Sequence, residues 1–140
     1  DHRDLHKEYR RQRQMCIRDR AVAALDHAYA PYSEYPVGAA LLCGSGRIHD
    51  GVNVENASYP AGICAERTAA FKAISVSDRE FAAIVVSSRN AASPCGICRQ
   101  VLAEFGPRMV VVLVDPQGTV RRETTLYELL PDVFSQLDLT

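Results

Sequence analysis

The sequence has no apolar run of about 18 residues, the shortest length that spans a bilayer as a helix. Its N-terminal region also lacks the apolar stretch found in secretory signal peptides. The net charge is −1 at pH 7, which is too small to attract nucleic acid or a membrane surface through a global field. We therefore expect a cytoplasmic protein with no membrane partner and no nucleic-acid partner.

Disulfide bonds cannot account for all the cysteines, because their number, five, is odd. Cytosolic thiols stay reduced, and clustered cysteines in such a protein are typical of metal sites or of catalysis. The chain of 140 residues suits one domain and is long enough to bury a core without disulfides. Charged residues make up 24% and hydrophobic residues 47%, which are ordinary values for a globular protein.

Residues 1–20 differ from the rest of the chain. They are polar and hold seven Lys/Arg against four Asp/Glu. The acidic residues dilute the positive charge, which disfavours a nucleic-acid-binding arm. A solvated tail or the frayed front of a helix is the simpler interpretation. Cys16 lies in this segment, and we do not expect it to bind metal.

From residue 20 onward the apolar pattern predicts alternating helices and strands. The expected elements are, in order, a helix at 20–30, strands at 36–43 and 48–56, a helix at 64–75, a strand at 81–88, a helix at 94–105, strands at 109–115 and 119–124, and a short helix at 125–131. Pro31 ends the first helix. The order α-β-β-α-β-α-β-β-α indicates an α/β fold in which helices flank a mixed sheet.

The helix expected at 94–105 has the sequence PCGICRQVLAEF. Pro94 suits the first turn of a helix. We expect its buried face to consist of Ile97, Val101, Leu102 and Phe105.

Cys95 and Cys98 at the start of this helix carry the first chemical signal. Two thiols at this spacing can hold a metal, form a redox pair of the thioredoxin type, or simply pack in the core. Cys64 also follows a loop and opens a predicted helix. Two helix N-termini that bear cysteine can converge on one metal ion, with the positive ends of both dipoles directed at it.

Three thiolates from Cys64, Cys95 and Cys98 leave one position of a tetrahedral zinc site open, which is the catalytic arrangement. A closed structural site needs a fourth ligand. Cys43 is the candidate, although a cysteine at the end of a strand is more often a buried core residue.

Charged residues stand beside the cysteines in both helix starts. Three thiolates make Zn²⁺ a poor Lewis acid, and Arg67 or Arg99 can offset this by donating hydrogen bonds to sulfur. The alternative is that these arginines are solvated. Glu66 follows Cys64 on the same turn. It can complement the helix dipole, or it can take a proton from a metal-bound water.

The C-x-E motif at 64–66 and the P-C-x-x-C motif at 94–98 match the signature of zinc-dependent nucleobase deaminases. The segments AYAPYSEYPVGAALL, GVNVENASYPAGICAERTAAFKA, SPCGICRQVLAEF and TLYELLPDVF further resemble the small homotetrameric cytidine deaminases of the cytidine/deoxycytidylate deaminase superfamily. The resemblance runs from about residue 21 to residue 140. It implies one deaminase domain over 21–140, preceded by an extension over 1–20 that is either disordered or an artefact of the sequence record.

The resemblance implies a three-layer α/β/α sandwich around a five-stranded mixed sheet, assembled as a homotetramer with shared active sites. It assigns one Zn²⁺ per subunit to Cys64, Cys95 and Cys98, and the proton shuttle to Glu66. Arg67 would support the zinc ligands. The remaining site residues that it implies bind substrate: Asn53 and Glu55 the ribose 3′-hydroxyl, Tyr35 the pyrimidine ring, Ala65 the base through its backbone, and Phe134 the base pocket of a neighbouring subunit.

Two of these substrate-binding assignments need comment. Asn53 and Glu55 could instead serve turn chemistry at the end of a strand. Tyr35 stands where the family more often has Phe, so its hydroxyl needs a hydrogen-bond partner.

The implied reaction is hydrolytic deamination of cytidine and 2′-deoxycytidine at C4, in pyrimidine salvage. Glu66 would move the proton from zinc-bound water to N3 and to the leaving amino group. A free nucleoside suits an enclosed, shared pocket better than a polynucleotide does. The competing interpretations are a blasticidin-type deaminase, a structural zinc module closed by Cys43, and a redox dithiol.

Overall fold

The fold centres on one five-stranded mixed sheet. The computed structural model describes residues 16–140. The strand order is β2-β1-β3-β4-β5, in which β3 and β4 are parallel and all other neighbours are antiparallel. The strands are β1 (Gly38–Cys43), β2 (Ile48–Val52), β3 (Phe81–Ser87), β4 (Val110–Val114) and β5 (Val120–Thr125).

The three central strands are apolar on both faces. Every residue of β1, β3 and β4 except Ser87 is hydrophobic or Gly, and all of them are buried. Such continuous runs are typical of strands covered on both sides. The edge strands β2 and β5 are only partly buried.

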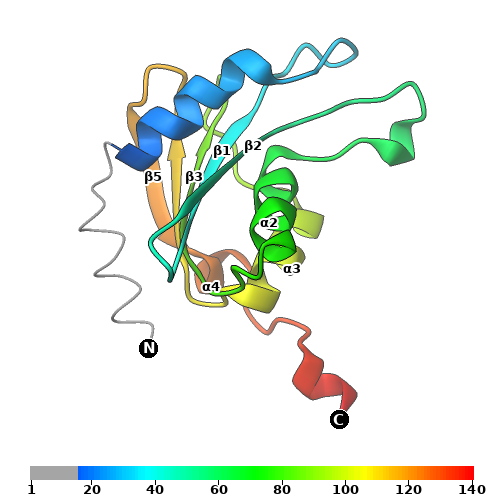
Figure 1. Ribbon diagram of the computed structural model, residues 1–140, viewed down its shortest axis with the longest axis vertical. Coiled ribbons are helices and arrows are strands. Elements are labelled where there is room, and N and C mark those ends of the chain that lie inside the picture. The colour runs from blue at the N-terminus through cyan, green and yellow to red at the C-terminus, as the bar shows by residue number, and fades with distance from the viewer. Residues whose placement is uncertain (1–15) are drawn as a thin grey trace.

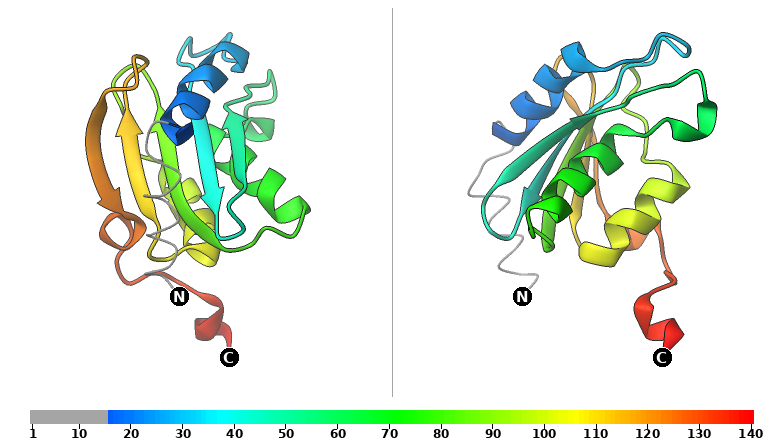
Figure 2. Two further views of the ribbon diagram at one scale, coloured as in Figure 1. Left: turned by 60° about the vertical axis from the view of Figure 1, so that its left-hand side comes forward. Right: turned by 45° about the vertical axis from the view of Figure 1, so that its right-hand side comes forward.

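Helices cover both faces of the sheet (Figures 1 and 2). Residues 16–24 are helical, continue into η1 (Leu25–His27) and lie on one face. The opposite face carries α2 (Ala65–Ser75), α3 (Gly96–Phe105) and α4 (Leu126–Leu129). Two hydrophobic clusters, one on each side of the sheet, form the core. The expected three-layer α/β/α architecture is confirmed.

The N-terminal helix extends across the boundary that was expected at residue 20. Ile17 and Ala21 are fully buried against the sheet. Close packing depends on Gly38, because a Cβ there would lie 2.3 Å from the carbonyl oxygen of Ala21. Residues 16–20 are thus part of the helical layer. The rest of the expected extension, residues 1–15, lies outside the described residues.

Small residues bring α2 close to β2. A Cβ at Gly51 would lie 2.5 Å from the Ala65 carbonyl oxygen and 2.5 Å from the Ala69 nitrogen. Ala69 and Ala73 on the same helix are fully buried. Because the side chains here are small, the N-terminus of α2 approaches the end of β2 closely. Cys64 therefore lies next to the end of β2.

Two details of the expected elements differ in the structure. The strand expected at 48–56 ends at Val52; beyond it Val54 makes only isolated bridges, to Tyr29 and Ile63. Ile97, expected on the buried face of α3, is 63% exposed. Cys98 takes that place instead, because it is fully buried and begins the i, i+3, i+4, i+7 series completed by Val101, Leu102 and Phe105.

The chain leaves the body of the molecule after α4 and ends in η3 (Gln136–Leu139) (Figure 1). Among residues 16–140, no helix has the length and apolar character needed to cross a bilayer.

Candidate functional site

Two helix N-termini bring the three expected cysteines together. Cys64 is the N-cap residue of α2, and Cys95 is the N-cap residue of α3. Cys98 lies in the first turn of α3 and is fully buried. Because each helix points the positive end of its dipole toward its N-cap, negative charge on these sulfurs is stabilised.

The three sulfur atoms lie close enough to share one ion. The Sγ atoms of Cys64 and Cys95 are 3.8 Å apart, and the ligand atoms of the three cysteines all lie within 4.8 Å of one another. A thiolate set of this kind suits Zn²⁺, with a fourth position open. Cys43 belongs to a different cluster, so it is not the fourth ligand, and the interpretation as a closed structural module loses its support.

The two neighbouring arginines have different partners. Arg67 donates from Nη2 to the Sγ atom of Cys64 at 3.5 Å, as expected. Its Nε is buried and has no hydrogen-bond partner among the described residues. Arg99 instead donates to the carbonyl oxygens of Pro94 and Leu129, both at 2.8 Å. Arg99 therefore braces the loop before α3 and does not contact sulfur.

A hydrogen bond between Cys64 and Cys98 shifts their two pKa values in opposite directions. The hydrogen bond from Cys98, followed by that from Arg67, holds the pKa of Cys64 well below its usual range. The same contact with Cys64, together with burial, raises the pKa of Cys98. The cluster thus holds a thiolate on Cys64, to which a metal cation can bind.

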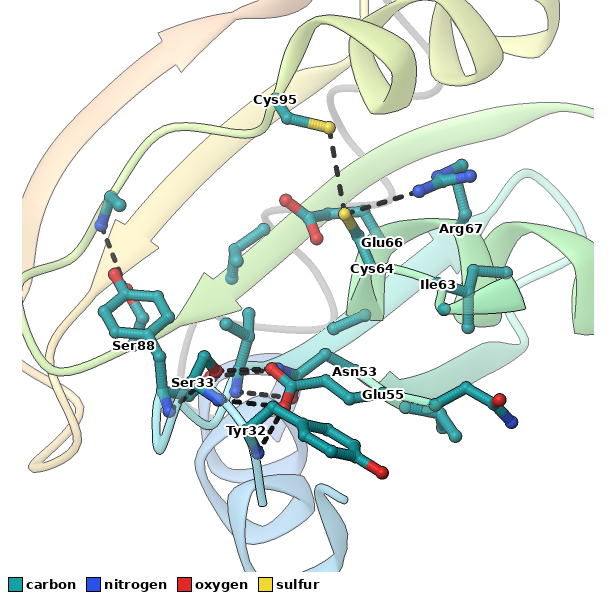
Figure 3. Close-up of a pocket in the computed structure, with 18 of the residues that line it drawn as sticks. Tyr32, Ser33, Asn53, Glu55, Ile63, Cys64, Glu66, Arg67, Ser88 and Cys95 are labelled. Carbon is teal, nitrogen blue, oxygen red and sulfur yellow. Dashed lines mark hydrogen bonds between the residues drawn. The ribbon is translucent and has the colours of Figure 1, made fainter. Parts of the chain in front are cut away.

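Glu66 is a buried carboxyl group beside these sulfurs (Figure 3). Burial raises the pKa of Glu66 to about 7, and the negative charge of Cys64 adds to the effect. A carboxyl group with this pKa can both accept and donate a proton near neutral pH. The alternative of a surface Glu that merely complements the helix dipole does not fit its 5% exposure.

A cavity of about 460 Å³ opens beside the sulfurs. Its volume lies in the range of small-molecule sites. Cys64, Glu66 and Cys95 lie at one end in Figure 3, whereas Asn53 and Glu55 lie at the other. The expected residues that line it are Tyr35, Asn53, Glu55, Cys64, Ala65, Glu66, Arg67 and Cys95.

Asn53 and Glu55 hold the loop that precedes β1. The Asn53 side chain accepts from the Val37 N–H at 2.9 Å and donates to the Tyr35 carbonyl oxygen at 2.8 Å. Its amide retains a second N–H and a second lone pair. Glu55 accepts from the N–H groups of Tyr32 and Ser33, and from the Ser33 hydroxyl. These bonds, led by that from the Ser33 hydroxyl, lower the pKa of Glu55.

Tyr35 has the hydroxyl partners that its side chain requires. Its OH donates to Asn90 Oδ1 and lies 3.1 Å from Ser88 Oγ, from whose hydroxyl it can accept. The guanidinium of Arg89 lies over its ring, 4.8 Å from the centroid. The ring is therefore fixed at the pocket wall from its edge and from one face.

Sequence reasoning missed two residues that hold this pocket together, Ser33 and Ser88. Ser33 precedes the strand expected at 36–43, and Ser88 ends the strand expected at 81–88. Short hydroxyl side chains in such places often bond locally to backbone or side chains. That signal is too common to single them out from sequence.

Of the two remaining expected residues, Ala65 lines the cavity and Phe134 does not. Ala65 is the first residue of α2, is fully buried and lines the cavity. Phe134 is 58% exposed and does not line the cavity of its own chain. Only the backbone carbonyl of Phe134 is held, by Gln100 at 2.8 Å.

Comparison with known proteins agrees with this geometry. Residues 11–114 match the family described as the cytidine and deoxycytidylate deaminase zinc-binding region. The chain belongs to the cytidine and deoxycytidylate deaminase family. The match begins at residue 11 and so includes Ile17, which packs on the sheet.

Several relatives cover most of the chain. A cytidine deaminase of Sporosarcina psychrophila is 49% identical over 120 residues, 84% of this chain and 88% of that protein. A cytidine deaminase of Halalkalibacterium halodurans is 47% identical over 130 residues, 91% of this chain and 97% of that protein. The crystal structure of cytidine deaminase from Burkholderia pseudomallei has a TM-score of 0.80 at 48% identity, covering 86% of this chain and 98% of that one.

Proposed function

We propose that this chain catalyses the hydrolytic deamination of cytidine and 2′-deoxycytidine to uridine and 2′-deoxyuridine, with release of ammonia. One observation carries the proposal: the sulfurs of Cys64, Cys95 and Cys98 converge beside the buried carboxyl of Glu66, next to a cavity of nucleoside size. Relatives named cytidine deaminase at 47–49% identity support the choice of substrate.

Cys64, Cys95 and Cys98 would hold one Zn²⁺ per subunit. The donor set fits, because three close sulfurs at two helix N-termini suit a tetrahedral cation and leave one position free. When bound, zinc supplies a water molecule that is acidic enough to lose its proton near neutral pH. Arg67 withdraws charge from Cys64, and so limits the loss of Lewis acidity that three thiolates cause.

Glu66 moves the protons of the reaction. Its carboxylate accepts the proton of the attacking water and delivers it to N3 of the pyrimidine, which makes C4 electrophilic. The resulting hydroxide adds at C4. The carboxylate then takes the second proton from the new C4 hydroxyl and gives it to the amino group, which leaves as ammonia as the C4 carbonyl forms. A pKa of about 7 suits both roles at neutral pH.

The other end of the cavity would bind the nucleoside. Asn53 and Glu55 carry the polar groups for the ribose 3′-hydroxyl, and that contact does not distinguish cytidine from 2′-deoxycytidine. The ring of Tyr35 would lie against the pyrimidine, because its hydroxyl is already held at Ser88. The backbone of Ala65 would contact the base.

A homotetramer with shared active sites would complete the pocket. The segment after α4 extends away from the body (Figure 1) and exposes Phe134, Leu137 and Leu139 by 58%, 77% and 76%. Large exposed apolar side chains on one segment mark an interaction site. We propose that this segment packs on a neighbouring subunit and contributes Phe134 to its base pocket.

The setting of the reaction follows from the substrate and the thiols. The cysteines among residues 16–140 are all free, and three close reduced thiols require a reducing compartment. We propose that the enzyme acts in the cytoplasm, in pyrimidine salvage.

The test measures deamination by the ultraviolet change that accompanies conversion of cytidine to uridine, with zinc per chain quantified in the same sample. We expect turnover of both nucleosides and a zinc content near one per chain at the Cys64 site. A Glu66→Gln enzyme should retain this zinc and lose at least about 10²-fold in kcat, because it cannot carry a proton.

The matched control is Glu104→Gln, which removes an exposed carboxylate from α3 and should behave like the wild type. Full zinc without turnover of either nucleoside would overturn the proposal. Wild-type rates from the zinc-loaded Glu66→Gln enzyme would overturn the role of that residue.

A further inference from the structure

A second group of metal-binding side chains lies at the other end of β1. Cys43, His49 and Asp78 place a sulfur, a ring nitrogen and a carboxylate oxygen within 4.8 Å of one another. Val37, which lines the deaminase cavity, is six residues away along the extended chain, roughly 20 Å at the rise of a strand. The cluster is therefore separate from the Cys64 site.

Three segments that are distant in sequence build this cluster. Cys43 ends β1, His49 lies on β2, and Asp78 lies in the turn between α2 and β3. His49 pairs directly with Leu41, so it shares the sheet face of Leu41 and Cys43. The N–H of Asp78 donates to the Ala73 carbonyl oxygen at 2.9 Å, which fixes the turn over that face.

The donor atoms are shielded from solvent. Cys43 is fully buried, and the side chains of His49 and Asp78 are 14% and 7% exposed. Asp78 Oδ2 lies 2.8 Å from His49 Nε2 and 3.0 Å from Arg47 Nε. The Arg47 side chain is 62% exposed, so it can swing into water without disturbing the core.

A hydrolytic Cys-His-Asp arrangement is the competing interpretation, and two observations oppose it. Burial, with the negative charge of Asp78, raises the pKa of Cys43 to about 12, so the thiol is protonated at neutral pH. The sulfur also has no exposed surface from which to reach a substrate. A reactive cysteine needs the reverse of both properties.

We propose that Cys43, His49 and Asp78 bind a second zinc ion, which fastens the β1–β2 hairpin to the turn after α2. Sulfur, imidazole and carboxylate are the ligands that Zn²⁺ takes in proteins, whereas Ca²⁺ and Mg²⁺ need more oxygen ligands than this cluster offers. On binding, the S–H bond of Cys43 breaks, a Zn–S bond forms and the proton goes to water.

Charge balance allows Zn²⁺ to replace the Arg47 guanidinium beside the Asp78 carboxylate. The cluster without zinc pairs the Asp78 carboxylate with the Arg47 guanidinium. With zinc, two negative ligands, the Cys43 thiolate and the Asp78 carboxylate, neutralise the divalent cation, and Arg47 is released to solvent. The buried net charge is therefore close to zero in both cases, as burial requires.

The first experiment counts metal in the untagged, reduced, full-length chain after equilibration with buffered micromolar Zn²⁺. We expect a second zinc equivalent beyond the one held at the Cys64 site. His49→Gln and Cys43→Ser should each lose that equivalent and keep wild-type deaminase activity. His27→Gln removes an exposed histidine and should keep both metals. One zinc per chain in the wild type, or a second zinc that survives both substitutions, would overturn the proposal.

A second measurement needs no variant, in case either substitution impairs folding. Co²⁺ titrated into the metal-free wild type should give two spectra, the first from a site with three thiolates and the second from a tetrahedral site with one. A single spectrum that saturates at one equivalent refutes the second site. This result is independent of the deaminase proposal, because activity is not the readout.

Discussion

Arg67 and Arg99 each lie in the first turns of a helix whose N-terminus carries clustered cysteines, yet only Arg67 contacts sulfur. Arg67 reaches Cys64 at 3.5 Å, whereas Arg99 holds two backbone carbonyl groups. A guanidinium that bonds a thiolate lowers the charge on that sulfur, and one that bonds carbonyls stabilises a loop. The two side chains should therefore respond differently to the same substitution.

We predict that Arg67→Gln lowers kcat by about 10- to 100-fold, the usual cost of removing a group that hydrogen-bonds a metal ligand. Arg67→Lys keeps the positive charge and should recover part of the loss. Arg99→Gln is the matched control: it should lower the melting temperature and leave kcat within a few-fold of the wild type. Steady-state kinetics and thermal unfolding check this, and equal kcat values for the two Gln variants would refute the role of Arg67.

The sequence predicts the positions of some site residues better than those of others. Cysteines at two predicted helix starts made a common cluster one of several interpretations, because a helix N-terminus fixes where its first side chains lie. The resemblance of the Cys64–Glu66 and Cys95–Cys98 motifs to the deaminases selected it among the alternatives. The partner of Arg99 was not predictable. Its bond to Leu129 joins residues 30 apart in sequence, and only the docking of α4 brings them together.

At the scale of elements, the apolar pattern predicted each strand that the structure describes. Its errors, at Ile97 and at the end of β2, lie beside the candidate site. Ile97 fits a helical apolar stripe in α3, but Cys98 occupies the buried position, where its sulfur faces those of Cys64 and Cys95. The strand expected to reach residue 56 stops at Val52, where the Asn53 side chain turns to bond the backbone of Val37. Beyond Val52 the backbone turns to bond Tyr29, whose N–H donates to the Asn53 carbonyl oxygen at 3.0 Å.

The N-terminal helix belongs to the core despite its polar sequence. Ile17 is fully buried, so we predict that Ile17→Ala lowers the free energy of unfolding by about 2–5 kcal/mol. Cys16→Ala, at an exposed neighbour, should change it by no more than about 0.5 kcal/mol. Urea unfolding followed by circular dichroism gives both values. Equal losses for the two variants would contradict the role of Ile17 in the core.

Asp50 joins three elements at the surface. It lies on β2 and accepts from Lys72 of α2 at 2.8 Å and from Arg20 of the N-terminal helix at 3.5 Å. The hydrogen bond from Lys72 is the main reason that the pKa of Asp50 lies below its ordinary value of 3.8, and partial burial opposes it. The pair therefore stabilises the fold above that pH, and the contribution is lost as the pH falls through the folded-state pKa.

We predict that Asp50→Asn lowers the free energy of unfolding at pH 7 by up to about 1 kcal/mol, because exposed ion pairs contribute little. The difference from the wild type should vanish near pH 2 and shrink in high salt. Urea unfolding at the two pH values measures it, with the exposed Asp26→Asn as a control for loss of surface charge. A penalty that persists at pH 2 would mean that Asp50 acts through packing.

At the scale of the whole molecule, the C-terminal segment stands apart from the pocket of its own chain (Figure 1). No aromatic side chain from the C-terminal segment lines the cavity, whereas that segment exposes Phe134, Leu137 and Leu139 to solvent. Both facts have one explanation if the segment of each subunit packs against the pocket of another. Reciprocal packing of this kind, in which each subunit completes the pocket of another, requires a symmetric oligomer.

We predict that Phe134→Ala lowers kcat/KM by about tenfold through loss of an aromatic contact to the base. The decisive test mixes this variant with Glu66→Gln in one oligomer. Where a Phe134→Ala chain receives its aromatic ring from a Glu66→Gln neighbour, a complete site forms. With random mixing of equal amounts, roughly a quarter of all sites are complete. Activity should then rise several-fold above the sum of the two variants assayed apart. Additive activity in co-expressed, mixed oligomers would show that Phe134 serves its own chain or none, and the shared site would have to be abandoned.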